Sequence, residues 1–155
     1  MHNKIIERKI FSKILVAIDQ LMTSTTDRVV DYAINIAQDY DAQLVLLHVI
    51  RADSNLHSVN PPTHIIEMRK QAQAYFVKIT QKIHEDNNKE NSIKLRTEII
   101  ASIRIADAIV SYAKDKHFDL IITGTRDRSK LKSILLGSVA SDVVRYAHCP
   151  VLTVK

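Results

Sequence analysis

Short runs of aliphatic and β-branched residues alternate along this chain with longer segments whose hydrophobic residues recur at helical spacing. This alternation is typical of β-α-β units, because each buried parallel strand is followed by a helix that crosses back over the sheet. The apolar runs predict buried strands, and the spacing of three to four residues predicts amphipathic helices. In the first half we expect strands at 13–18 and 43–49, a helix at 26–40, and a second helix carrying Ile65 to Ile83 after a polar loop at 50–61.

The second half continues the same alternation with one distinctive strand. Apolar residues from Ile93 to Ile99 alternate with Lys94, Arg96 and Glu98, which predicts a strand with one wet face at the edge of the sheet. The remaining elements are expected to be helices at 105–113 and 137–147, and strands at 120–123 and 150–154.

Five strands and four helices favour an α/β fold with an open parallel sheet covered by helices on both faces. Right-handed crossovers and an outer third strand suit the strand order 3-2-1-4-5. In that order the winding reverses between strands one and four, and ligands of open α/β sheets bind beyond the strand carboxyl ends at such a point. The topology therefore predicts a crevice between Asp19, after strand one, and Gly124, after strand four.

Glycine is scarce and its placement points to the same crevice. Average usage of about 7% predicts roughly 11 glycines in a chain this long, but only Gly124 and Gly137 occur. Both lie on the connection between strand four and the last helix, where a positive φ or a close backbone approach is the usual reason for glycine. In one interpretation, Gly124 and Gly137 have no binding role and only form a turn and the start of a helix. Alternatively, the free N–H groups of a helix that opens at Gly137, Ser138 and Val139 would bind a phosphate.

Composition sets limits on the class of protein. The chain has 155 residues with 46% hydrophobic and 25% charged content, which suits one globular domain over 1–155 with an N-terminal arm at 1–10. The net charge of +5 is mostly interspersed, and its local excesses at the arm and around Arg126 lack the aromatic-rich strand or zinc spacing of a nucleic-acid module. The apolar runs are far shorter than the roughly 20 residues of a membrane helix. A lone cysteine, Cys149, and the absence of a signal-peptide pattern favour the reducing cytoplasm.

Three segments together carry a family resemblance. These are residues 123–126 (Thr-Gly-Thr-Arg), residues 131–139 (Leu-Lys-Ser-Ile-Leu-Leu-Gly-Ser-Val) and residues 150–154 (Pro-Val-Leu-Thr-Val). With the strands at 15–19 and 46–50, they make the whole chain resemble the universal stress protein family. The resemblance implies a Rossmann-like fold of the adenine nucleotide alpha hydrolase type and the binding of ATP, AMP or another adenine nucleotide, with or without Mg²⁺.

The resemblance also implies roles for particular residues. The nucleotide-binding branch carries glycine, two residues, glycine, nine residues, glycine and then serine or threonine, which this chain matches at Gly124, Gly137 and Ser138. By resemblance, the phosphates would lie on Gly124, Gly137, Ser138 and Val139, beside Arg126. The nucleoside would lie against Ala17, Asp19, Thr123 and the backbone of Val49. Antiparallel pairing of the strand at 151–154 would form a homodimer.

Asp127 departs from this pattern, because it occupies the position of the second glycine. Two unit charges about 5 Å apart at an effective dielectric near 20 repel by roughly 3 kcal/mol, about two orders of magnitude in affinity. Arg126 or a metal ion would offset part of this, and Mg²⁺ favours a carboxylate together with phosphate oxygens. Asp127 therefore either weakens nucleotide binding or assists it through a metal.

Other chemistry has little support in the sequence. The seven histidines show no paired metal-ligand spacing, Cys149 suits a small buried residue better than a nucleophile, and neither a P-loop nor a Gly-x-Ser-x-Gly elbow occurs. Three hypotheses follow. The first is a stress-response regulatory protein that binds an adenine nucleotide, with protein partners that the sequence does not identify. The second is a nucleotide-free dimer acting through protein contacts. The third is a slow ATPase or phosphotransferase that uses Asp19 or Asp127 around a metal.

Overall fold

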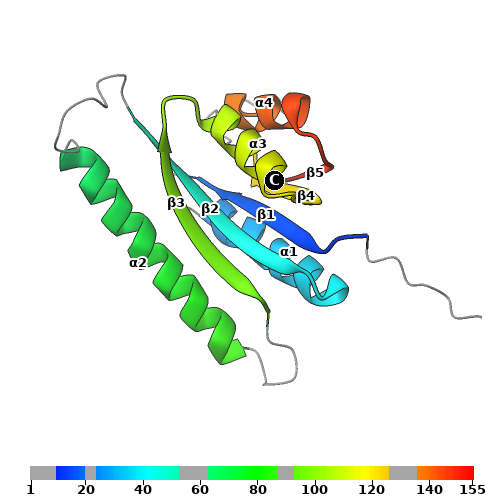
Figure 1. Ribbon diagram of the computed structural model, residues 1–155. Helices are drawn as coiled ribbons and strands as arrows, with labels where there is room; N and C mark the ends of the chain where they lie inside the picture. Colours follow the sequence, from blue (N-terminus) through cyan, green and yellow to red (C-terminus); the bar gives the residue numbers. More distant parts are fainter. Residues whose placement is uncertain (1–9, 20–23, 53–62, 87–92, 126–135) are drawn as a thin grey trace, which may run out of the picture.

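The computed structural model describes residues 10–19, 24–52, 63–86, 93–125 and 136–155 (Figure 1). Within them the chain alternates between five strands and four helices, as the hydrophobic pattern predicts. The strands are β1 (Lys13–Ile18), β2 (Gln43–Arg51), β3 (Leu95–Ser102), β4 (Leu120–Gly124) and β5 (Val151–Val154). The helices are α1 (Ser24–Tyr40), α2 (Thr63–Asp86), α3 (Ile105–Asp115) and α4 (Ser138–Tyr146).

The strands form one parallel sheet in the order β3-β2-β1-β4-β5, which confirms the predicted topology. β1 lies at the centre, with β2 on one side and β4 on the other. The winding reverses between β1 and β4, so the carboxyl ends of these two strands border the predicted crevice.

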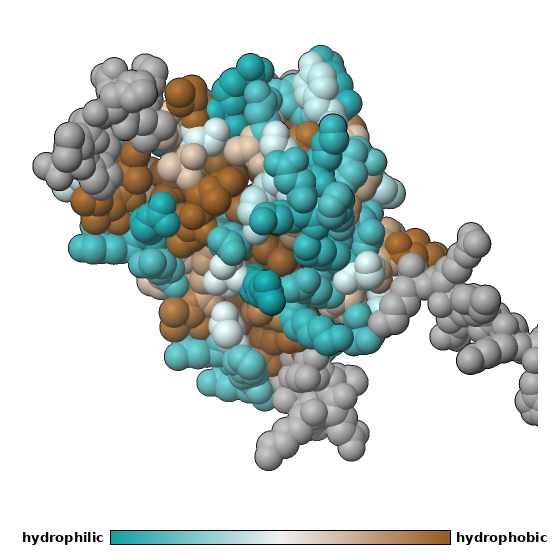
Figure 2. All heavy atoms as spheres, in the orientation of Figure 1, coloured by the Kyte–Doolittle hydropathy of each residue, from teal (hydrophilic) through white to brown (hydrophobic). Residues whose placement is uncertain are grey.

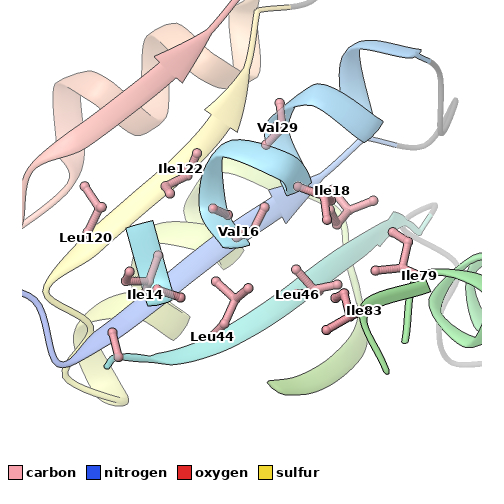
Figure 3. Close-up of a cluster of buried hydrophobic side chains, with 14 of the residues drawn as sticks. Ile14, Val16, Ile18, Val29, Leu44, Leu46, Ile79, Ile83, Leu120 and Ile122 are labelled. Carbon is pink, nitrogen blue, oxygen red and sulfur yellow. The ribbon is translucent and has the colours of Figure 1, made fainter. Parts of the chain in front are cut away.

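Two hydrophobic layers hold helices on both faces of the sheet. Alternate residues of the central strands face α1 and α2, and Figure 3 shows Ile14, Val16 and Ile18 of β1 in this first layer. The intervening residues, such as Leu15 and Ala17, face α3 and α4 in the second layer. Each fully buried aliphatic side chain contributes about 1.5–3 kcal/mol, so the central strands are the most strongly held part of the fold. Figure 1 shows the two helix pairs on opposite sides of the sheet.

β3 is the predicted edge strand, and its residues Arg96, Thr97 and Glu98 are exposed. Its edge is partly covered by α2, whose Arg69 donates from a guanidinium nitrogen to the carbonyl of Ile99 at 3.3 Å. The predicted end of β2 was wrong, and the predicted bounds of β3 were also shifted, since β3 runs on to Ser102. The loop expected at 50–61 begins later, because Ile50 and Arg51 continue β2 and pair with Ala101 and Ser102 of β3. A single apolar residue followed by a charge carries too little pattern to extend a predicted strand.

Asp119, just before β4, is hydrogen-bonded to the amino-terminal end of β1. Its Oδ2 accepts hydrogen bonds from the Ser12 amide at 2.8 Å, the Ser12 hydroxyl at 2.7 Å and the Lys13 amide at 2.8 Å. Burial by itself would raise the pKa of this carboxyl, but the three hydrogen bonds and the nearby Lys13 ammonium lower it overall. The charged form of Asp119 therefore supports the sheet at the end opposite the crevice.

We expect Asp119→Ala to lower the free energy of unfolding by about 2 kcal/mol, because hydrogen bonds to a charged group are lost. Urea denaturation at pH 7 measures this effect. The pKa of Asp119 is lower in the folded state, so its contribution is complete above the unfolded pKa near 4 and disappears as the pH falls through the folded value. Asp115→Ala at the exposed end of α3 is the control and should leave stability unchanged. Equal stability of the two variants would contradict this role.

Candidate functional site

The carboxyl ends of the strands are staggered, and this stagger shapes the crevice. β1 ends at Ile18, which pairs with His48 of β2. β2 and β3 continue side by side for three further residue pairs, ending at Arg51 and Ser102. The pairing of β1 with β4 ends at Ala17 and Thr123. The longer strands therefore form a wall beside the point where β1 and β4 stop.

Four predicted nucleoside-side residues share one face of the sheet at this end. Ala17 and Val49 belong to the hydrophobic layer beneath α3 and α4. Thr123 follows Ile121 of the same layer at strand spacing and is the register partner of Ala17. Continued alternation along β1 places Asp19 on this face as well, directly beyond the strand. The structure thus brings these four positions together on the side of the sheet where α4 begins.

The first turn of α4 supplies donors for an anion. The helix starts after Gly137, which has no side chain and therefore cannot cap the first amides. The first turn of α4 contains no acidic residue. The first hydrogen bond of the helix runs from the Ser141 amide to the Gly137 carbonyl at 2.8 Å. The amides of Ser138 and Val139 precede that bond and have no acceptor within the helix. Together with the positive end of the helix dipole, they form an anion-binding position.

The two glycines do not adopt the backbone conformation that only glycine tolerates. Gly137 has φ −58° and ψ 154°, and no described glycine has a positive φ. A positive φ was one of the two reasons suggested by the sequence, and the structure rules it out for Gly124 and Gly137. The remaining reason is space, since a glycine lets another group approach the backbone closely.

A hollow of about 180 Å³ lies between the first turns of α3 and α4 and the end of β2. Of the predicted residues, Ser138 and Val139 line it. The sequence analysis did not assign its other walls to the site, and it placed Arg51 in a loop. The additional lining residues are Arg51, Ile103, Arg104, Ile105, Ala106, Asp107 and Asp142. Figure 2 shows mostly hydrophilic residues over α3 and α4 in this part of the molecule.

The charged side chains around the hollow balance one another. Arg104 and Asp107, at the start of α3, form an ion pair of 2.8 Å between Nε and Oδ2. Arg51 and Asp142 add one charge of each sign. The described side chains therefore create no strong field of one sign, and the helix amides are the main attraction for an anion.

His48 is the one fully buried imidazole at this end of the described structure. Its side chain is 1% exposed, and its Nδ1 lies 3.2 Å from the carbonyl oxygen of Ile18. Burial lowers the pKa of His48, although the hydrogen bond to Ile18 and the charge of Asp19 act in the opposite direction. The ring is therefore neutral at pH 7 and donates from Nδ1, because a carbonyl oxygen can only accept.

The other candidates for chemistry supply no reactive centre among the described residues. Cys149 is half-buried against the layer beneath α3 and α4, and burial raises the pKa of its thiol, so it stays protonated. No group of three metal-ligating side chains occurs in the part of the chain that the structure describes. Likewise, none of its helices is long and apolar enough to cross a membrane. Arg126 and Asp127 lie outside the described residues.

The family model for the Universal stress protein family matches residues 11–155. The chain belongs to this family. Universal stress protein MJ0531 of Methanocaldococcus jannaschii is 36% identical over 126 residues, covering 80% of this chain and 71% of the relative. Universal stress protein YxiE of Bacillus subtilis is 34% identical over 151 residues, covering 94% of this chain and 99% of the relative.

Solved structures of universal stress proteins share the same fold. One is a universal stress protein of Archaeoglobus fulgidus in complex with dAMP, with a TM-score of 0.68 and 22% identity. The alignment covers 94% of this chain and 99% of that protein. Universal stress proteins thus share the five-stranded parallel architecture of this chain. The predicted fold and the predicted membership of the family are both confirmed.

Proposed function

We propose that this universal stress protein is a regulatory protein of the stress response that binds ATP or a related adenine nucleotide in the crevice between β1 and the start of α4. One observation carries the proposal: Ala17, Val49 and Thr123, with Asp19 next along β1, lie on the face of the sheet where α4 begins with amides that have no acceptor within the helix. The dAMP complex of the Archaeoglobus fulgidus relative supports the ligand class.

Each end of the crevice suits one part of an adenine nucleotide. The phosphates would accept hydrogen bonds from the amides of Ser138 and Val139 and from the Ser138 hydroxyl, with Gly124 and Gly137 leaving room for them. Asp19 would accept from a ribose hydroxyl. The backbone of Val49, on the wall where β2 extends past β1, would pair with the adenine edge. This arrangement requires no catalytic group, and binding would act by changing conformation or the choice of a protein partner.

The first test is Gly137→Ala, measured by isothermal titration with ATP and Mg²⁺. Alanine tolerates the φ and ψ of this position, and at a helix start it costs only about 1 kcal/mol, so the variant should fold. Its Cβ would obstruct the phosphates, and we expect affinity to fall by about tenfold or more, equivalent to about 1.4 kcal/mol.

Ser111→Ala, on the exposed side of α3, is the matched control and should bind like the wild type. Unchanged affinity of Gly137→Ala would show that phosphates do not approach this glycine. No heat and no thermal shift of the wild type with millimolar ATP would refute nucleotide binding itself and favour the nucleotide-free interaction protein.

Asp127 decides how strongly the phosphates are held. This residue replaces a family glycine, and its charge would oppose phosphate unless Arg126 or Mg²⁺ offsets it. We expect purified Asp127→Gly to retain more ATP than the wild type, as read by mass spectrometry after denaturation. Equal or lower retention of ATP would contradict repulsion by Asp127 and indicate that this residue assists binding. In that case the affinity of the variant for ATP should no longer depend on Mg²⁺, which is the second measurement.

We also propose that β5 forms a homodimer by pairing with β5 of a second copy. β5 is the last strand of the described sheet, and Pro150 and Val154 direct their carbonyls toward Ile121 and Thr125 on the β4 side. Because these directions alternate along a strand, the backbone groups of Val151 and Thr153 face outward. Their N–H and C=O groups are available for a further strand.

Thr153→Pro tests this pairing, since proline removes an outward N–H without disturbing the pairing with β4. Sedimentation velocity at micromolar concentration should show a dimer for the wild type and a monomer for the variant. Thr153→Val is the control, because it keeps the amide and should remain dimeric. A monomeric wild type, or a dimeric Thr153→Pro protein, would contradict pairing through β5.

A further inference from the structure

His48 lies where β1 leaves the sheet, directly behind the proposed site. It pairs in register with Ile18, the last residue of β1, and Asp19 follows immediately. On the other side of β1, the pairing with β4 has already ended at Ala17 and Thr123. Ile18 is therefore the last residue of β1 that pairs with β2, and the peptide that joins it to Asp19 lies beyond the pairing with β4.

The imidazole of His48 supplies a contact at this point. Its Nδ1 donates to the Ile18 carbonyl at 3.2 Å, and the ring is 1% exposed. This carbonyl belongs to the same peptide plane as the Asp19 amide. The contact adds to the pairing of Ile18 with β2 and further restricts rotation of this plane, which would swing the Asp19 side chain.

The side chain of His48 acts from the opposite face of the sheet to the ligand. Leu44 and Leu46 of β2 face the layer of α1 and α2, and strand alternation places His48 on their side. Ala17 and Val49 lie on the other face, beneath α3 and α4. An effect of His48 on binding must therefore pass through the backbone of Ile18 and Asp19.

We propose that His48 is a positioning residue of the nucleotide site, which fixes the Ile18–Asp19 peptide so that the Asp19 carboxylate meets the ribose. The inference rests on the proposed function and assigns to a core histidine a task that its burial alone does not explain. An apolar residue would fill the same space between the sheet and the helices, but it would leave the carbonyl of Ile18 without this donor.

The test compares His48→Asn with His48→Leu by isothermal titration with ATP and Mg²⁺. The amide nitrogen of asparagine stands at the same number of bonds from the backbone as Nδ1, so it can replace the donor, whereas leucine cannot. We expect His48→Leu to weaken ATP binding by about tenfold, a usual size for coupled neighbours, and His48→Asn to bind nearly as the wild type does. A purely structural role would change the melting temperatures of the variants but leave both affinities equal.

A double-mutant cycle with Asp19→Ala identifies the route. If His48 acts by positioning Asp19, then His48→Leu should cause no further loss of affinity once Asp19 is alanine. Should His48→Leu fail to fold, His48→Gln replaces it, because its amide is one carbon too far out and should also weaken binding.

The outcomes separate the two proposals. Wild-type ATP binding with no loss in a folded His48→Leu or His48→Gln protein would overturn the positioning role alone. The same loss in the Asp19→Ala background as in the wild type would also overturn it. A wild-type protein that binds no ATP would overturn the proposed function and this inference with it.

Discussion

The burial of β1 on all sides is the constraint on which the site depends. Its backbone pairs with β2 and β4, and its side chains face a hydrophobic layer on each side of the sheet. Within such a strand a carboxylate would be desolvated without compensation, which costs several kcal/mol. Asp19 is the first position after the strand, and the first at which this part of the chain can present a charge. The location of a polar group beside the crevice is therefore a consequence of how completely Ile14 to Ile18 are enclosed.

Much of the fold could be predicted because the hydrophobic pattern reports burial directly. Alternating Lys94, Arg96 and Glu98 marked β3 as the edge strand, and right-handed crossovers then left one natural strand order. The end of β2 was missed at Arg51, because pairing with Ser102 holds that residue in the strand and pairing between distant segments leaves no local trace. The same limit applies to the hollow between α3 and α4, whose walls come from three separate segments.

The position of the candidate site could be predicted from the sequence, but the structural role of some of its residues could not. Strand ends and scarce glycines pointed to Asp19, Gly124 and Gly137, and the structure places Ser138 and Val139 in the first turn of α4. Of the two reasons that the sequence offered for these glycines, the structure rules out a positive φ, and the residue type alone could not distinguish it from the need for space. The task we assign to His48 was equally hidden. A histidine between Leu47 and Val49 has the pattern of a core residue, and only the distance from Nδ1 to the Ile18 carbonyl shows what it contacts.

Because the charges around the hollow balance, the charge of one further residue, Asp127, would have a large effect on the proposed binding of phosphate. Arg104 is already paired with Asp107, and Arg51 and Asp142 add one charge of each sign to the lining, so the described side chains give an anion no net positive charge. The start of α4 then supplies the attraction, and a helix end is equivalent to only about half a unit charge. A full negative charge added by Asp127 would exceed that contribution at a comparable distance. If the proposed site binds phosphate beside Asp127, we therefore expect binding to need a compensating cation, either Arg126 or a metal ion with the Asp127 carboxylate as a ligand.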